Sequence, residues 1–141
     1  MPTLNVKFAL AAAAASDAGK VTVLNLAEKG VNAIDPALAT MCPGLSKLDL
    51  GDNVLGDAAA LKALSKLASL KWLSLANNNL IDAALEPMAS LVNMRVLNVS
   101  GNRLAGGLLG TSVRPTSNLL LLLLLLRIRV LARGCMGIIP E

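Results

Sequence analysis

The sequence contains no histidine and no tyrosine, and Phe8 and Trp72 are its only aromatic residues. Without histidine, the chain can form neither a Ser-His-Asp or Cys-His catalytic system nor a metal site that uses imidazole. It also lacks the glycine-rich motifs that cradle phosphates. We therefore expect no catalytic, cofactor-binding or metal-binding residues, and a protein that is not an enzyme.

Excess positive charge is missing from most of the chain. Residues 1–110 carry nine Lys and Arg against eight Asp and Glu, whereas residues 111–141 carry four Arg against Glu141 alone. A nucleic-acid-binding face needs clustered basic residues and aromatic side chains for stacking. Residues 1–110 supply neither in sequence, so we predict no nucleic-acid partner.

Cysteine is scarce too. Cys42 and Cys135 are too few for a disulfide scaffold or a four-thiolate zinc site. Two free thiols in a reducing compartment are the favoured interpretation, and a single disulfide is the alternative. We therefore expect a cytoplasmic, intracellular protein. The stretch FALAAAAAS after Lys7 leaves open a secreted or cell-surface protein with a signal peptide.

Apolar residues make up 55% of the 141 positions, enough for one domain with a sizeable core. The longest apolar run is Leu119–Leu126, which Arg127 ends. A membrane-spanning helix needs about 20 apolar residues. We therefore predict no transmembrane segment. An exposed leucine run favours association, so self-association through Leu119–Leu126 is a further expectation.

Four segments repeat one pattern, L-x-x-L-x-L-x-x-N-x-L. They are Val21–Val31, Leu45–Leu55, Leu70–Leu80 and Met94–Leu104. The leucines at position four are spaced by 24, 25 and 24 residues: Leu24, Leu48, Leu73 and Leu97. Position nine is asparagine in the last three segments, where a buried amide can donate and accept hydrogen bonds from repeat to repeat: Asn53, Asn78 and Asn102.

This pattern resembles the leucine-rich repeat family over Val21–Leu104. Apolar positions four and six alternate with a polar one and predict a short strand, and the later three-residue apolar spacing predicts a short helix or 3₁₀ turn. Asp57 and Asp82 stand at expected helix N-caps. The resemblance implies an α/β solenoid, a short curved right-handed superhelix with parallel strands on the concave face and short helices on the convex face.

The two ends depart from the repeat. We expect residues 1–20 to form a capping helix over Thr3–Ala15 followed by a turn, and residues 21–104 to form four repeats. Residues 105–141 form an atypical C-terminal segment. Extending the register by 24 residues from Leu97 reaches Leu121, which predicts a degenerate fifth repeat. A tail outside the family pattern and an anchoring segment are the alternatives.

The exposed strand positions are the candidate site. The resemblance implies a protein-binding platform on the concave face, and Trp and Arg dominate many interfaces. Opposite charges in neighbouring columns favour a partner of mixed charge. We therefore predict a protein-interaction module, a small adaptor or regulatory subunit whose partner is another protein. The predicted partner-binding residues are Asn25, Lys47, Asp49, Lys71, Trp72, Ser74, Arg95 and Asn98.

Overall fold

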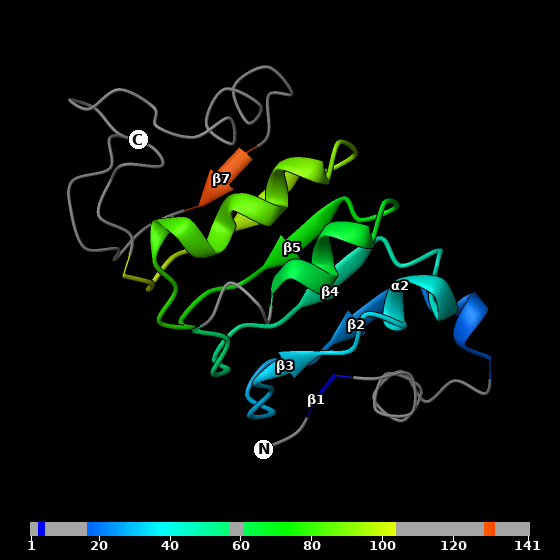
Figure 1. The fold of residues 1–141 in the computed structure, drawn as a ribbon, viewed down its shortest axis with the longest axis horizontal. Coiled ribbons are helices and arrows are strands. Elements are labelled where there is room, and N and C mark those ends of the chain that lie inside the picture. Colours follow the sequence, from blue (N-terminus) through cyan, green and yellow to red (C-terminus); the bar gives the residue numbers. More distant parts are fainter. Residues whose placement is uncertain (1–2, 5–16, 57–60, 104–128, 132–141) are drawn as a thin grey trace.

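The computed structural model describes residues 3–4, 17–56, 61–103 and 129–131. One strand per repeat joins a five-stranded parallel sheet, and short helices form a second layer on one side of it (Figure 1). The sheet contains, in spatial order, β2 (Val23–Asn25), β4 (Lys47–Asp49), β5 (Trp72–Ser74), β6 (Val96–Asn98) and β7 (Arg129–Leu131).

The strand register confirms the repeat alignment. Leu24 pairs with Leu48, Leu48 with Leu73, and Leu73 with Leu97. Each repeat therefore contributes the same position to the same row of the sheet, as the solenoid prediction requires.

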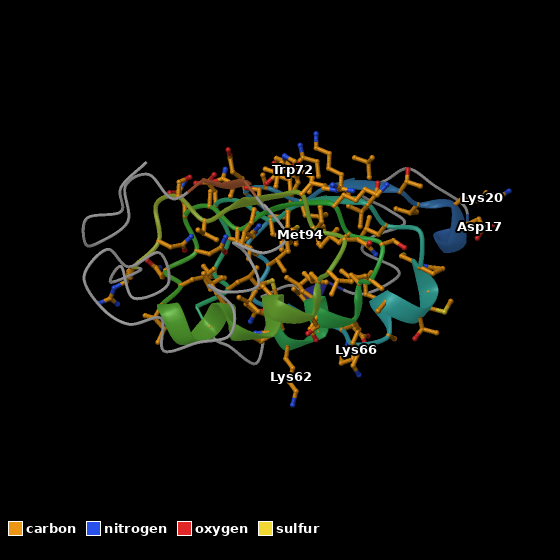
Figure 2. The ribbon with its side chains drawn as sticks, turned by 90° about the horizontal axis from the view of Figure 1, so that it is seen from above. Asp17, Lys20, Lys62, Lys66, Trp72 and Met94 are labelled. Atoms are coloured by element: carbon orange, nitrogen blue, oxygen red, sulfur yellow. The ribbon has the colours of Figure 1, made fainter. Side chains whose placement is uncertain are left out.

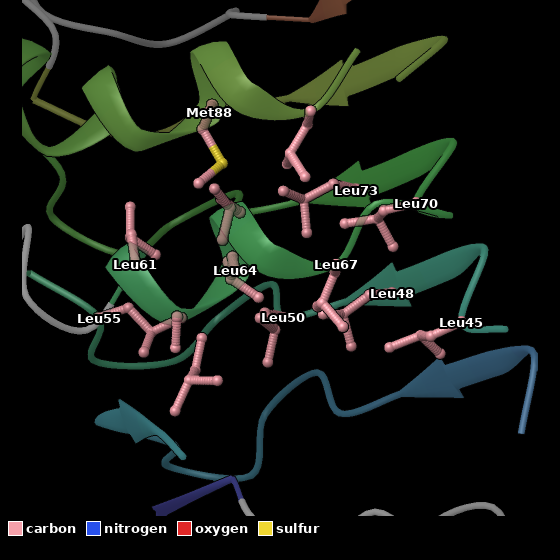
Figure 3. Packing of buried hydrophobic residues seen from close by; sticks show 14 of the residues in the cluster. Leu45, Leu48, Leu50, Leu55, Leu61, Leu64, Leu67, Leu70, Leu73 and Met88 are labelled. Atoms are coloured by element: carbon pink, nitrogen blue, oxygen red, sulfur yellow. The ribbon is translucent and has the colours of Figure 1, made fainter. Parts of the chain in front are cut away.

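The core lies between the sheet and the helical layer. Leu48 and Leu73 are fully buried and project from the sheet toward Leu64 and Leu67 on the helical side (Figure 3). Met94, which begins the fourth repeat, also lies between the layers (Figure 2). Because each strand and each helix has only one apolar face, stacking the repeats makes these faces into one continuous cluster.

The helical layer is short, and most of it is 3₁₀ helix, one of the two forms that the apolar spacing allows. Among the described residues it contains α2 (Leu38–Met41), η2 (Ala63–Lys66) and η3 (Asp82–Ser90), while η1 (Ala18–Lys20) lies at the end of the sheet, shortly before β2 (Figure 2). The prediction that Asp82 caps its helix is wrong. Ile81 occupies the N-cap with extended backbone, and Asp82 is the first helical residue. Asp57 lies outside the described residues.

The asparagine column behaves as predicted. The Oδ1 of Asn53 accepts hydrogen bonds from the backbone N–H groups of Lys29 and Val31, at 3.1 and 2.9 Å. Its Nδ2 donates to the carbonyls of Leu26 and Leu50, both at 2.9 Å. One side chain thus provides hydrogen-bond partners for backbone groups in the turn of the preceding repeat and in the turn of its own repeat.

Asn78 and Asn102 repeat this arrangement further along the array. The Nδ2 of Asn78 donates to the Leu50 carbonyl at 2.8 Å. The Oδ1 of Asn102 accepts from the N–H groups of Asn78 and Leu80, both at 2.9 Å. Lys29, which holds position nine of the first repeat, is exposed. The first repeat is therefore atypical, as expected for a residue that cannot accept a hydrogen bond.

A second ladder, which the sequence pattern did not reveal, lies just before the strands. Ser69 Oγ donates to the Pro43 carbonyl at 2.7 Å, and Asn93 Nδ2 donates to the Ala68 carbonyl at 2.8 Å. Each side chain reaches back by one repeat. Adjacent repeats are therefore held together at both ends of their strands.

The N-terminal region differs from expectation where it is described. Thr3–Leu4 forms β1, which pairs in parallel with β3 (Ala33–Ile34), so these two residues do not start a helix. Thr is β-branched and suits a strand, and the alanines that favour a helix come later. The rest of the expected capping helix, residues 5–16, lies outside the described residues.

The fifth strand is also displaced from its expected position. Leu97 pairs with Val130, not with Leu121. A β-branched residue such as Val130 favours a strand, whereas a leucine run has high helix propensity. The run Leu119–Leu126 lies outside the described residues, as does Cys135.

Candidate protein-binding surface

The predicted concave face is the side of the sheet on which none of the described helices lies. In a view along the layers, Trp72 projects from the sheet, while Lys62 and Lys66 project from the helical layer on the opposite side (Figure 2). Strand positions two and three are exposed or half-buried in every described repeat. Side chains at these positions can therefore meet a partner.

Trp72 lies at the centre of this face. The register places Lys47 on one neighbouring strand beside it and Val96 on the other. The Lys47 ammonium stands over the indole ring, with Nζ 4.7 Å from the ring centroid. Such a cation–π contact contributes about 0.5–1 kcal/mol at an exposed site. Trp72 is half-buried, so the Lys47 contact coexists with surface that remains open to a partner.

Lys71 and Arg95 stand one residue before the strands. The Arg95 N–H donates to the Lys71 carbonyl at 2.7 Å, which makes these residues neighbours in adjacent repeats. Both are exposed. Within the described residues, the ion pair found is Lys20 with Asp17, which leaves Lys71 and Arg95 without a carboxylate partner there.

The column at position five has a structural role that sequence reasoning missed. Asn25, Asp49 and Asn98 each accept a hydrogen bond through Oδ1 from the backbone N–H two residues later, at 3.1, 2.9 and 3.1 Å. This local pattern is a turn that Asn and Asp favour, so the type of residue was the available signal. These three side chains shape the strand exits and also line the surface.

Ser74 is the most enclosed of the predicted residues, with 4% of its surface exposed. It occupies position five of the third repeat, between Asp49 and Asn98. Gly51 is its neighbour in the preceding repeat: a Cβ built on this glycine would lie 3.7 Å from Ser74 Oγ. Ser74 therefore offers a partner little contact area.

Position eight forms a column of left-handed backbone. Glu28, Asp52, Asn77 and Gly101 have φ angles of 59°, 55°, 55° and 69°. Asn77 Nδ2 donates to Asp52 Oδ1 at 2.9 Å, and a Cβ built on Gly101 would collide with Asn77 Oδ1. Asn and Asp tolerate this conformation better than most residues, and glycine adopts it freely. The column fixes how the chain leaves the concave face.

Chemistry is sparse in the described part of the chain. It holds no group of three or more Cys, Asp or Glu side chains arranged to bind a metal ion. Cys42 is a free, buried thiol, and burial raises its pKa above the ordinary value. None of the described helices is long and apolar enough to cross a membrane.

Comparison with known proteins agrees with this architecture. Residues 19–80 match the leucine-rich repeat family model. An internalin C2 from Listeria monocytogenes is 20% identical, with a TM-score of 0.50 over 74% of this chain and 58% of that one. An internalin (InlF) from the same species is also 20% identical, with a TM-score of 0.43 over 59% and 28% of the two chains. No curated protein sequence matches.

This chain therefore spans 58% of the one internalin and 28% of the other, and at 20% identity the likeness to internalin C2 concerns the fold alone. The family assignment stands on residues 19–80 and on the aligned repeats. Residues 19–80 belong to the leucine-rich repeat family, and the described fold is a leucine-rich repeat solenoid.

Proposed function

We propose that this protein is a small adaptor or regulatory subunit that binds another protein on its concave face. Leucine-rich repeat domains are protein-interaction modules, and residues 19–80 match that family. We propose that the binding surface is the open face of the sheet. Open sheet positions in four consecutive repeats supply a continuous platform, to which no described helix contributes.

The observation that carries the proposal is the position of Trp72. The single tryptophan of the chain lies half-buried in the middle strand, with Lys71 and Arg95 exposed beside it. Binding energy at protein interfaces concentrates on Trp, Tyr and Arg side chains near the centre of the contact. A tryptophan held by packing and by Lys47 also loses little conformational entropy on binding.

Quantitative capture from cell extracts tests this proposal. The bait is the full chain as wild type, Trp72→Ala, Arg95→Ala and, as control, Lys62→Ala on the helical side (Figure 2). We expect partners captured by wild type and by the control to fall at least about tenfold with Trp72→Ala and Arg95→Ala, a loss of roughly 1.4 kcal/mol.

Equal partner sets for all four baits would contradict the use of the concave face. Asp49→Ala is not a suitable variant, because Asp49 Oδ1 holds the Gly51 N–H and its loss would perturb the turn. Circular dichroism of each bait confirms that capture is compared between folded proteins.

The proposed location is the cytoplasm. The buried free thiol of Cys42 is compatible with a reducing compartment and supports this choice. The alternative is a secreted protein whose N-terminal stretch is removed. Mass spectrometry of the mature protein from its native cells distinguishes the two, because a chain that still starts at Met1 or Pro2 has kept this stretch.

A further inference from the structure

Three basic residues, Lys47, Lys71 and Arg95, are brought to the region of Trp72 by the strand register, although they are dispersed in sequence. Register places Lys47, Trp72, Val96 and Arg129 side by side on successive strands. Lys71 and Arg95 directly precede Trp72 and Val96. We name Lys47, Lys71, Trp72 and Arg95 the basic patch, with Arg129 at the adjoining register position. The four residues of the patch were predicted from the sequence as partner-binding residues, but their grouping follows from the strand register.

Asp49 and Asp52, the acidic residues of the second repeat on this face, each hold a neighbouring group through one carboxylate oxygen. Asp49 Oδ1 accepts the Gly51 N–H at 2.9 Å, and Asp52 Oδ1 accepts from Asn77 Nδ2 at 2.9 Å. In contrast, neither Lys71 nor Arg95 has an ion-pair or side-chain hydrogen-bond partner among the described residues. The side chains of Lys71 and Arg95 therefore remain available for recognition.

We infer that the basic patch binds an acidic segment of the partner protein, an extended peptide with carboxylates on Lys71 and Arg95 and an apolar side chain against Trp72. This inference rests on the proposed function and deepens it by specifying the chemistry of the partner. Neighbouring strands lie about 4.8 Å apart, and alternate side chains of an extended peptide about 6.6 Å. Two carboxylates separated by one residue thus match the reach of the two long basic side chains.

The acidic side of the face argues for a peptide and against nucleic acid. Asp49 and Asp52 follow Lys47 in the second repeat, so negative charge lies within a few residues of this lysine. A peptide can restrict its carboxylates to the basic side, whereas a phosphate backbone repeats its charge at every nucleotide. The patch also has a single indole for stacking, and nucleic-acid recognition uses several such rings.

Selection from a phage-displayed library of random dodecapeptides tests the inference on the full chain. Peptides selected on wild type are synthesised, and their affinities are measured by fluorescence anisotropy. The test variant is Lys71→Glu/Arg95→Glu. Its matched control is Lys62→Glu/Lys66→Glu on the helical side. Each pair of reversals lowers the formal net charge by four, from +4 to 0, so that overall charge is equal in the two variants.

We expect selected peptides to be enriched in Asp and Glu around one apolar residue. Affinity should fall at least about tenfold on the test variant and change less than about twofold on the control. The single variant Arg95→Gln, with a smaller loss in the same direction, provides the test if the double reversal unfolds. Equal affinities on both double variants would overturn the inference.

Two other outcomes separate this inference from the proposed function. Peptides without acidic enrichment that nevertheless lose binding with Trp72→Ala would refute the acidic segment and leave the concave-face proposal standing. Peptides indifferent to Trp72→Ala and to both double variants would count against both. Oligo(dT) of the same length, bound as tightly as the best peptide and lost on the test variant, would assign the patch to nucleic acid and also overturn the inference.

Discussion

Replacement of Asn53 by alanine tests the physical basis of the fold. Asn53 is 5% exposed and makes five hydrogen bonds to the backbone. When the Asn53 side chain is removed, two of the carbonyls that it binds still have another donor. The Leu50 carbonyl still accepts from Asn78 Nδ2, and the Gly51 carbonyl still accepts from the Glu28 N–H. Three other groups depend on Asn53 for their hydrogen bond: the N–H groups of Lys29 and Val31 and the carbonyl of Leu26.

Each buried polar group left without a partner costs about 1–3 kcal/mol. The Val31 N–H is buried and takes the full cost, whereas the Lys29 N–H is partly buried and can be reached by water. We therefore expect Asn53→Ala to lower the free energy of unfolding by about 2–5 kcal/mol. A domain of this size has a total of roughly 5–15 kcal/mol, so the change is a large fraction of its stability.

Urea unfolding followed by Trp72 fluorescence measures this change, because the single tryptophan gives one signal from the middle strand. The control is Asn32→Ala, which deletes the same amide from an exposed position and should alter stability by less than about 0.5 kcal/mol. If Asn53→Ala were no less stable than Asn32→Ala, the asparagine column would not hold the repeats together.

Three further predictions concern the backbone, the core and the buried thiol. Gly101→Ala should lower the thermal midpoint, at a cost of about 1–3 kcal/mol from its positive φ and from the collision with Asn77, and a second change, Asn77→Gly, should recover part of the loss. Leu73→Ala empties the centre of the core and should cost about 2–5 kcal/mol in urea unfolding; a value below 1 kcal/mol would contradict the packing. Because the pKa of the Cys42 thiol is raised in the folded state, the unfolded chain releases the thiol proton at a lower pH than the folded chain does. The contribution of the thiol to stability is therefore present below about pH 9 and is lost as the pH rises above it. The stability advantage of wild type over Cys42→Ala should therefore shrink from pH 7 to pH 10, and a constant difference would argue against this linkage.

The repeat itself was predictable from sequence because its period is fixed by geometry. Leucines at positions four and six must face the core in every copy, so their spacing sets the register of Leu24, Leu48, Leu73 and Leu97. The hydrogen-bonding role of Asn53 followed from the need to satisfy a buried turn. These features depend on local rules that each repeat obeys by itself.

Features set by tertiary pairing were not predictable in the same way. Thr3–Leu4 becomes a strand because Ala33–Ile34 offers it a backbone partner, which local propensity does not encode. The pairing of Val130 with Leu97 spans 33 residues and breaks the period on which the prediction relied. The place of Arg129 beside Val96, next to the basic patch, depends on that pairing and was therefore not predicted.

The low exposure of Ser74 had a different cause. Alternation along the strand places Ser74 on the concave face, but it does not say how much of that surface neighbouring side chains cover. Exposure also depends on the size of the neighbouring side chains, and Ser74 is a small residue between the larger Asp49 and Asn98. Alternation predicts the direction of a side chain but not its accessibility.

The side-chain ladders give the array a polarity. Asn53, Asn102, Ser69 and Asn93 all reach back to backbone groups of the preceding repeat. Each repeat is therefore completed by its successor. Deleting the last repeat strips partners from the turn backbone of the one before it, whereas deleting the first leaves the side chain of Asn53, and not a turn backbone, without its partners. Removal of the C-terminal repeat should consequently lower the stability of the remaining array more than removal of the N-terminal repeat.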